Sequence, residues 1–288
     1  MPIDYDKLLA IKIPDVVQTY GEKETILYAL GLGLGLGLDP MSEEALSFVT
    51  EPRLQALPTM ATVLGYPGFW LRNLDTGVDW VKVLHGEQSV TLHRPLPPRG
   101  AVVGHNRVID IIDKGPGKGA LLYVERKVID RQSGELLATL NQTAFCRGDG
   151  GFGGPKRDAP APHPIPDRAP DLVCDLPTSP QSALIYRLSG DNNPLHSDPA
   201  IAKAAGYPRP ILHGLASFGV AGYALLKSTA GCDPARLTSI AGRFSAPVFP
   251  GETIRTEIWR DGSVVSFRAR VMERDVIAIN NGRAEVRA

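Results

Sequence analysis

Two halves of similar length and similar order constrain the fold of this chain more than any other feature of its sequence. A stretch at 151–180, with eight prolines between Pro155 and Pro180, separates them. Repeated prolines restrict the backbone to extended conformations and remove N–H donors, so this stretch is predicted to be an extended surface linker. The 288-residue chain is therefore expected to divide into a domain at 1–150, a linker at 151–180 and a domain at 181–288.

Short patterns recur in the same order in both halves. Pro95 and Pro98 precede a glycine and a β-branched strand in the first half, as Pro247 and Pro250 do in the second. Downstream of these prolines stand YVERKVIDR and SFRARVMER, which alternate apolar and charged residues as half-exposed antiparallel strands do. The difference in residue number between equivalent positions of the two halves is smaller at the strand match than at the proline match. This predicts an insertion in the first half around 113–119. We interpret the chain as a duplicated unit.

Each half is predicted to hold one apolar helix. Residues 214–231, GLASFGVAGYALLKSTAG, are apolar nearly all round and predict a buried helix. Its small residues would let a sheet pack closely against it. The segment 57–70 is the weaker equivalent in the first half. The predicted fold is α+β, a double hot-dog in which each of two tandem antiparallel sheets wraps around a central helix.

The bulk composition excludes several classes of function. Lysine plus arginine equal aspartate plus glutamate at 31 each, so no long-range field favours nucleic acid. Cys146, Cys174 and Cys232 are scattered, which argues against a disulfide framework or zinc site and for a reducing compartment. The N-terminus lacks a signal-peptide pattern, the C-terminus lacks a peroxisomal address, and the one apolar run is too short for a membrane span. We expect a cytoplasmic protein without membrane or nucleic-acid partners.

The segment YRLSGDNNPLHSDP carries the strongest chemical signal. It places Asp191, Asn193 and His196 around Pro194, on a turn that proline stiffens, and Asp198 caps the short helix that follows. An acid, an amide and an imidazole on one rigid turn are suited to activating water. The alternative is a polar loop whose Asp and Asn satisfy nearby backbone groups.

His213-Gly214 stands where the apolar helix begins. Free N–H groups at a helix start carry partial positive charge, and glycine there lets a ligand approach closely. Such donors would polarise a carbonyl that becomes an enolate. Together with the preceding turn, this predicts acid–base chemistry on an acyl thioester. The alternative is a plain helix start with a core histidine.

No cofactor or metal is predicted. The run Gly31–Leu38 fails the dinucleotide pattern, and Gly115–Gly119 fails the phosphate-loop pattern, although Lys114 beside it remains either a solvated side chain or a phosphate contact. No GxSxG nucleophile motif is present. His196 with Asp198 is too sparse a metal-ligand set, and His213 belongs to a different element.

The chain resembles the MaoC-like, R-specific enoyl-CoA hydratase family, in particular the hydratase 2 unit of peroxisomal multifunctional enzyme type 2. The resemblance covers most of the chain. It is carried by LHGEQ, DKGPGKG, GGFGGPKR, YRLSGDNNPLHSDP, PILHGL and GRFSAPVFPGET. It implies two hot-dog folds, of which the first is non-catalytic and accommodates the acyl chain.

The resemblance also implies roles for individual residues. Asp191 and His196 would hold one water and act together as base and acid. Asn193 would orient them, and the amide of Gly214 would polarise the thioester carbonyl. Contacts with the CoA ester are implied for the remaining positions, which are His85, Gly86, Lys114, Asn192, Pro194, Leu195 and Phe244.

The predicted function is a lyase that reversibly hydrates trans-2-enoyl-CoA to (3R)-3-hydroxyacyl-CoA, with the thioester as substrate rather than cofactor. One alternative is a dehydratase for acyl-carrier-protein thioesters or for branched or steroid acyl chains. A hot-dog thioesterase and a non-catalytic acyl-binding module are further alternatives. The duplicated halves suggest that one chain forms the unit that single hot-dog relatives build as a dimer. A further homodimer of two such chains is also expected.

Overall fold

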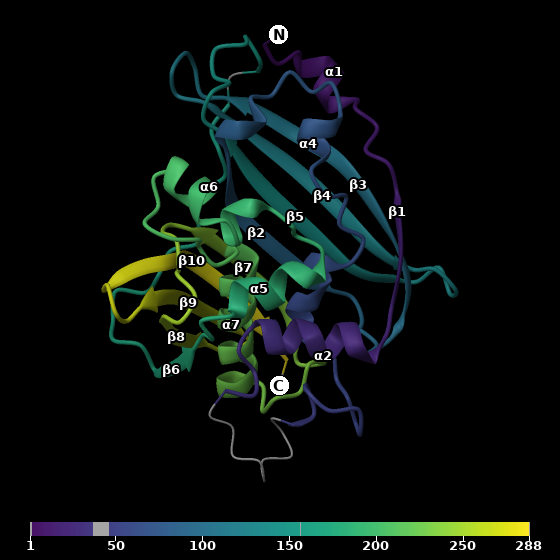
Figure 1. Ribbon diagram of the computed structural model, residues 1–288, viewed down its shortest axis with the longest axis vertical. Coiled ribbons are helices and arrows are strands. Elements are labelled where there is room, and N and C mark those ends of the chain that lie inside the picture. The colour runs from purple at the N-terminus through teal and green to yellow at the C-terminus, as the bar shows by residue number, and fades with distance from the viewer. Residues whose placement is uncertain (1, 37–45, 156, 288) are drawn as a thin grey trace.

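Ten strands form one continuous sheet in the computed structural model, which describes residues 2–36, 46–155 and 157–287 (Figure 1). The strands are β1 (Val16–Tyr20), β2 (Val83–Leu92), β3 (Gly100–Asp113), β4 (Ala120–Asp130), β5 (Leu136–Cys146), β6 (Leu172–Pro177), β7 (Leu237–Phe244), β8 (Thr253–Asp261), β9 (Val264–Val271) and β10 (Val276–Val286). The α-helices are α1 (Tyr5–Leu9), α2 (Glu22–Gly31), α4 (Trp70–Asn73), α5 (Ser182–Tyr186), α6 (Pro199–Ala204) and α7 (Gly214–Thr229). The 3-10 helices are η1 (Pro58–Val63), η2 (Trp80–Lys82), η3 (Arg187–Ser189) and η4 (Pro194–His196).

The strand order confirms the duplication. Outward from the junction, the order is β2-β5-β4-β3-β1 in the first half and β7-β10-β9-β8-β6 in the second. Each half therefore repeats one topology, and its two matched patterns fall on β3 with β8 and on β4 with β9. Strands β2 and β7 pair antiparallel, with Gln88 opposite Gly242, and join the halves into one sheet. This is the double hot-dog arrangement that the sequence predicts.

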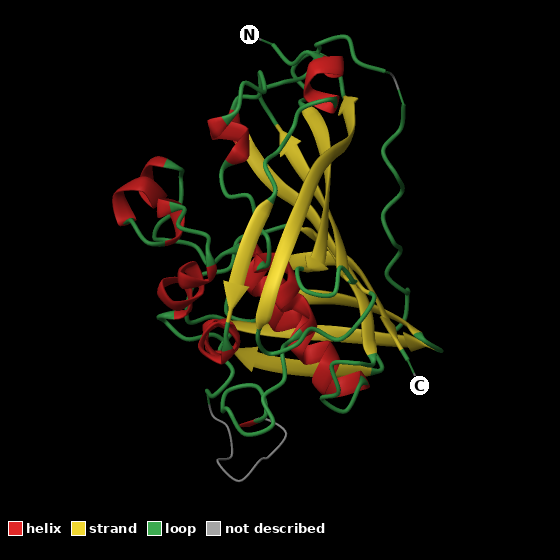
Figure 2. Ribbon diagram, turned by 90° about the vertical axis from the view of Figure 1, so that its right-hand side faces the viewer, coloured by secondary structure: helices red, strands yellow, loops and turns green. Residues whose placement is uncertain are grey.

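Helix α7 is the central helix of the second half, as predicted. Its sixteen residues are mostly buried, and Figure 2 shows it as the long helix lying across the strands. Two glycines allow close packing against the first half. A Cβ at Gly219 would lie 2.7 Å from the Leu32 side chain, and a Cβ at Gly222 would lie 2.5 Å from Cγ2 of Thr59. The helix therefore packs against both halves of the chain.

The expected central helix of the first half is replaced by the short 3-10 helix η1. Pro58 starts it, and the chain turns extended at Leu64. Gly65 follows with φ +60°, and a Cβ there would lie 2.6 Å from Cα of Gly104. A helix through 57–70 would carry Gly65 and Pro67 in its interior, where both are unfavourable, so the prediction of an α-helix here was wrong.

The stretch predicted as linker ends in a strand. Residues Leu172–Pro177 form β6, which pairs antiparallel with β8 at the outer edge of the second half. The predicted insertion at 113–119 is confirmed, because the β3–β4 hairpin spans six residues where the matching β8–β9 hairpin spans two. The glycine-rich run after Gly31 lies partly outside the described residues. Within the described ranges, none of the helices has the length and apolarity that a bilayer span requires.

Candidate active site

The loop that carries the predicted catalytic residues is held by its own side chains. Gly190 takes φ +118°, a conformation that favours glycine, and ends η3. The carboxylate of Asp191 then accepts a hydrogen bond from the amide of Asn193 at 3.1 Å. The side-chain oxygen of Asn193 accepts one from the amide of Leu195 at 3.0 Å and so caps η4, in which Pro194 is the first residue. Asn193 thus organises the turn, which orients the residues on either side.

His196 lies at the end of this turn and is 8% exposed. Its Nδ1 lies 2.9 Å from the backbone oxygen of Ile211. A carbonyl only accepts hydrogen bonds, so Nδ1 carries the proton and Nε2 keeps its lone pair. Burial lowers the pKa of His196 below its usual value, while the Ile211 hydrogen bond and the charge of Asp191 act in the opposite direction. The ring is therefore a neutral base at neutral pH.

His213 completes the site; the sequence pattern indicated the helix start where it stands but gave its side chain no role in the site. It is 1% exposed and precedes the first residue of α7. Its Nε2 donates to the backbone oxygen of Asp191 at 3.1 Å, and its ring stacks on His196 with centroids 3.7 Å apart. Burial, followed by the charge of His196, lowers its pKa to about 3. The signal that could have identified it is the His-Gly pair at the helix start.

Asp191, His196 and His213 each offer an atom within 4.8 Å of the others. His213 does lie in a different element from His196, but this does not keep its ring out of the group, so that argument against a metal site was wrong. Three protein ligands are the number that catalytic zinc takes. One nitrogen of each ring is already committed to a backbone carbonyl. The absence of a metal stays an expectation. The ring nitrogens left for a ligand are Nε2 of His196 and Nδ1 of His213.

Gly214 opens the N-terminal end of α7 to a ligand. It is exposed, and the Phe244 ring is close enough that a Cβ at Gly214 would lie 3.4 Å from it. The His85 ring contacts Phe244 edge-on, with centroids 4.8 Å apart. Burial lowers the pKa of His85 to about 4, despite its hydrogen bond to the Glu87 backbone. The structure thus places His85 and Phe244, from different halves of the chain, side by side at the helix start.

The remaining predicted contact residues surround this site at different distances. Asn192 and Pro194 are exposed on the catalytic turn, where a ligand can reach them. Gly86 lies at a bulge between β2 and β5, and a Cβ there would lie 3.1 Å from the backbone oxygen of Thr143. Lys114 is exposed on the β3–β4 hairpin, with Nζ 5.4 Å from the centre of the Phe145 ring. It contacts none of the catalytic groups.

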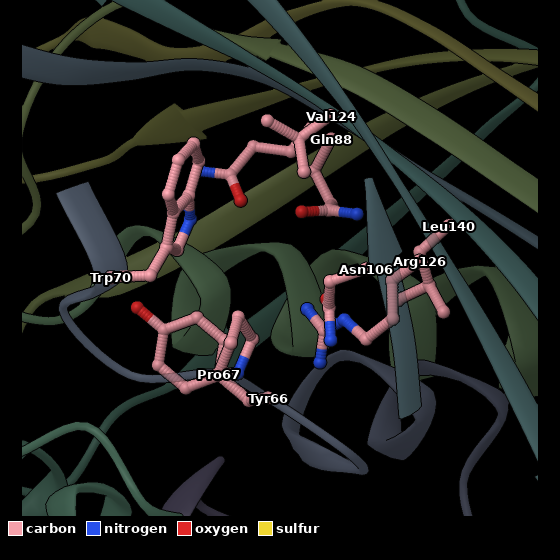
Figure 3. Close-up of a pocket in the computed structure, with 9 residues that line it drawn as sticks. Tyr66, Pro67, Trp70, Gln88, Asn106, Val124, Arg126 and Leu140 are labelled. Atoms are coloured by element: carbon pink, nitrogen blue, oxygen red, sulfur yellow. The ribbon is translucent and has the colours of Figure 1, made fainter. Parts of the chain in front are cut away.

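A polar pocket in the first half was also missed by sequence reasoning. It is lined by Tyr66, Pro67, Trp70, Gln88, Asn106, Val124, Arg126, Leu140 and Gln142 (Figure 3). Burial, followed by the charge of Asp191, raises the pKa of Tyr66 in this pocket to about 12. Polar residues on the inner face of strands are the only sequence signal for this pocket.

Family models match both halves of the chain separately. Residues 162–282 match the MaoC like domain, and residues 18–148 match the MFE-2 hydratase 2 N-terminal domain. The two matches together cover the fold from β1 to β10 and correspond to its two hot-dog units.

Characterised relatives are similar over nearly the whole chain. The 3-hydroxyacyl-thioester dehydratase Y of Mycobacterium tuberculosis is 44% identical and aligns with 90% of this chain and 88% of its own. The peroxisomal enoyl-CoA hydratase 2 of Arabidopsis thaliana is 40% identical, over 94% and 91%. A crystal structure of a MaoC-like dehydratase from Phytophthora capsici is 38% identical, with a TM-score of 0.85 over 98% of both chains.

Proposed function

The chain belongs to the MaoC-like, R-specific enoyl-CoA hydratase family, and we propose from this premise that it hydrates trans-2-enoyl-CoA to (3R)-3-hydroxyacyl-CoA reversibly. The observation that carries the proposal is the grouping of Asp191 and His196 beside the open start of α7. A base, an acid and a set of N–H donors then face one space, which is what addition of water to a conjugated thioester needs.

The proton balance can be completed by one water and one imidazole. Nε2 of His196 accepts a proton from water while the oxygen attacks C3. The negative charge moves to the thioester oxygen as an enolate. The imidazolium, stabilised by the Asp191 carboxylate, then returns the proton to C2. Because one group removes and returns the proton, the hydroxyl on C3 and the hydrogen on C2 arrive on the same face, and no metal is required.

The enolate oxygen needs donors that are already in place. The amide of Gly214 is the first N–H of a sixteen-residue helix, and the first N–H groups of a helix have no partner within it. Fixed donors of this kind stabilise developing charge without reorganising during the reaction. Phe244 and His85 close the side of this position and would exclude water from the carbonyl.

A single absorbance assay tests the proposal. Hydration removes the conjugated double bond and its ultraviolet absorbance while CoA remains esterified, so thiol release stays at background. A thioesterase would instead release thiol, and a binding module would change neither signal. Loss of the absorbance without thiol release is expected. Either other pattern, in protein shown to be folded, would contradict the assignment.

The dehydratase direction is the one alternative with specific support. The relative from Mycobacterium tuberculosis is named a 3-hydroxyacyl-thioester dehydratase, and the site works equally in reverse. Comparing initial rates on enoyl and 3-hydroxyacyl substrates, each attached to CoA or to acyl-carrier protein, distinguishes the carriers and gives the equilibrium. A strong preference for the carrier-protein thioesters would favour this alternative.

Location and assembly are further parts of the proposal. Cys146, Cys174 and Cys232 form no disulfide with one another, which supports a reducing compartment, and we assign the protein to the cytoplasm. The relative from Arabidopsis thaliana is named peroxisomal, so imaging of the tagged protein is the decisive test. We also propose a homodimer of the double unit. Light scattering after size exclusion should give twice the chain mass of 31.0 kDa.

A further inference from the structure

Four buried aromatic rings form a continuous column that ends at the catalytic turn. In order they are Tyr28 of α2, Tyr186 of α5, His213 at the start of α7, and His196, and each is at most 8% exposed. The ring centroids are 5.8 Å apart for the first pair, 5.0 Å for the second and 3.7 Å for the third. This ring column therefore runs from the first half of the chain to the proposed base.

Close helix packing fixes the far end of the ring column. In Figure 1, α2 lies beside α5 and in front of α7. A Cβ at Gly31 of α2 would lie 3.2 Å from Cα of Tyr186, so these two helices touch through their backbones. A Cβ at Gly219 of α7 would lie 3.0 Å from the hydroxyl oxygen of Tyr28. The two tyrosines are therefore enclosed by helices from both halves of the chain and have little room to move.

The near end of the column supports a ring that a hydrogen bond holds at one edge. Nδ1 of His196 donates to the backbone oxygen of Ile211, while Nε2 faces the proton transfer. A bond at one edge lets a ring rock about that edge, which would move Nε2. His213 covers a face of the ring at an interplanar angle of 27° and so limits this motion. A misplacement of about 1 Å in a reacting group can cost about a hundredfold in rate, so the contact bears on the chemistry.

Apolar core packing alone does not explain His213. Its Nε2 donates to the backbone oxygen of Asp191, but its Nδ1 is buried without a partner in the described ranges. A buried polar atom left unpaired costs about 1–3 kcal/mol, which a leucine at this place would avoid. Burial lowers the pKa of His213 to about 3, so the ring stays neutral and does not oppose the proton that His196 takes up. The position therefore suits a flat, neutral ring.

We propose that His213 is a positioning residue that holds the His196 ring in its catalytic orientation, and that Tyr186 and Tyr28 brace it from behind. The proposal rests on the hydratase function proposed above and adds residues to its machinery. Because His213 also donates to the Asp191 backbone, one side chain contacts both members of the catalytic pair. Through Tyr28 the first half then takes part in the chemistry, although it supplies no group to the reaction.

Three substitutions separate the ring of His213 from its hydrogen bond. His213→Phe keeps a flat ring and loses the donor, His213→Gln keeps a donor and loses the ring, and His213→Leu loses both. In hydration of a trans-2-enoyl-CoA by the full-length protein, kcat should fall by about tenfold to a hundredfold in the last two variants. KM should change little, because the base is disturbed rather than the predicted substrate contacts. His213→Phe should retain most of kcat; a kcat in His213→Gln at or above that of His213→Phe overturns the proposal.

Magnetic resonance of the histidine rings follows the contact without substrate. The chain has six histidines, so labelling their Cε1 atoms gives a simple spectrum in which His196→Gln identifies the His196 signal. The ring current of the stacked His213 should shift this signal upfield of the free-histidine position, and His213→Leu should remove the shift. If the His213 variants do not fold, the wild-type spectrum decides. An unshifted His196 signal contradicts the stacked orientation and overturns the proposal.

Tyr28→Leu tests the far end of the ring column. It acts through two further rings, so kcat should fall by only about threefold to tenfold, and the His196 signal should move part of the way to the free position. The control is Phe48→Leu, which removes one ring of a buried pair with Tyr223 that contains no histidine and whose centroids are 6.0 Å apart. It should leave both readouts as in the wild type. Equal changes in Tyr28→Leu and Phe48→Leu would reflect a general loosening of the core and would reject the brace.

The two readouts separate this proposal from the hydratase assignment. If the wild type hydrates enoyl esters and His213→Leu and His213→Gln keep full kcat, the hydratase function stands and the positioning role fails. If the protein hydrates nothing, but the His196 signal is shifted in the wild type and moves in His213→Leu and Tyr28→Leu, the hydratase assignment fails while the brace on the His196 ring is supported.

Discussion

The two halves share one strand order and differ in what their sheet encloses. In the second half, α7 fills the concave side and presents its N-terminal end to the catalytic turn. In the first half, η1 has six residues, and the sheet behind it carries Arg126 and Gln88 on its inner face. The same sheet thus supports a helix that serves the chemistry in one copy. In the other copy it forms the wall of a pocket.

The difference shows how a duplicated unit can divide its work. Shortening the central helix removes the N–H donors that the reaction needs and opens space beside the sheet. That half has no counterpart of the catalytic turn, and we propose that it accommodates the acyl chain. β2 and β7 pair directly, so Gln88, which lines the first-half pocket, lies opposite Gly242 of the second half.

Placing an arginine on β9 at position 269, which matches Arg126 of β4, should have the largest effect. Ala269→Arg would place a cation in the apolar core of the second half, where neither pocket nor water receives it. We expect a loss of about 3–5 kcal/mol in the free energy of unfolding, enough to prevent folding of many variants. Chemical denaturation followed by circular dichroism measures it. Arg268→Lys, next to it on β9, is the matched control and should change little; an equally stable Ala269→Arg would show that both sheets tolerate a buried cation.

Removing the catalytic carboxylate should have the next largest effect. Asp191→Asn keeps the side-chain size but removes its charge, so the imidazolium of His196 loses its stabilising partner. Turnover should fall by about a hundredfold or more, the scale of one acid–base group. Steady-state hydration rates measure it, with Glu125→Gln on the outer face of β4 as the control. Unchanged turnover in folded Asp191→Asn would remove the catalytic role from the second half.

Local patterns in the sequence predict much of this division. Proline pairs and alternating strands predict the duplication, and continuous apolarity predicts α7, because these features depend on neighbours along the chain. The cap formed by Asp198 is confirmed as well, since its carboxylate accepts from the amides of Ala200 and Ile201. The catalytic turn is readable for the same reason, because its hydrogen bonds run between residues two positions apart.

Features that depend on distant partners were not predictable in this way. His213 joins the site because its ring stacks on His196 and binds the Asp191 backbone, contacts that cross from one element to another. The alternating residues of β4 indicate a half-exposed strand, but they do not say which set of side chains points inward. The inward orientation of Arg126 depends on the register of β4 with its neighbouring strands. The end of η1 depends on the same arginine, which binds two of its terminal carbonyl oxygens.

The stacked histidines of the second half should lower the free energy of unfolding as the pH falls. The folded pKa of His213, about 3, lies below the unfolded value of roughly 6.5. The unfolded chain therefore binds the proton first. The stability due to neutral His213 is complete above pH 6.5 and is lost as the pH falls toward 3. Between pH 6.5 and 5 the loss should approach about 2 kcal/mol.

Urea unfolding at several pH values measures this contribution. In His213→Gln the unfolding free energy should decline less steeply below pH 6.5 than in the wild type. His93→Gln changes an exposed histidine of the first half and serves as the control, with the slope of the wild type. Parallel curves for wild type and His213→Gln would show that His213 is protonated in the folded protein.

The contact between Gly222 of α7 and Thr59 of η1 tests the smallest effect. A methyl group at Gly222 would collide with Cγ2 of Thr59 at 2.5 Å. Overpacking costs about 1–3 kcal/mol, whereas Gly→Ala within a helix gains about 1 kcal/mol, so Gly222→Ala should destabilise by about 1 kcal/mol. Thr59→Ser removes the colliding methyl and keeps the hydroxyl. The double variant should recover the stability of Thr59→Ser or exceed it, because only the helix-propensity gain remains. Additive effects in this cycle would mean that α7 and η1 pack independently, and that the two halves do not share one core at this point.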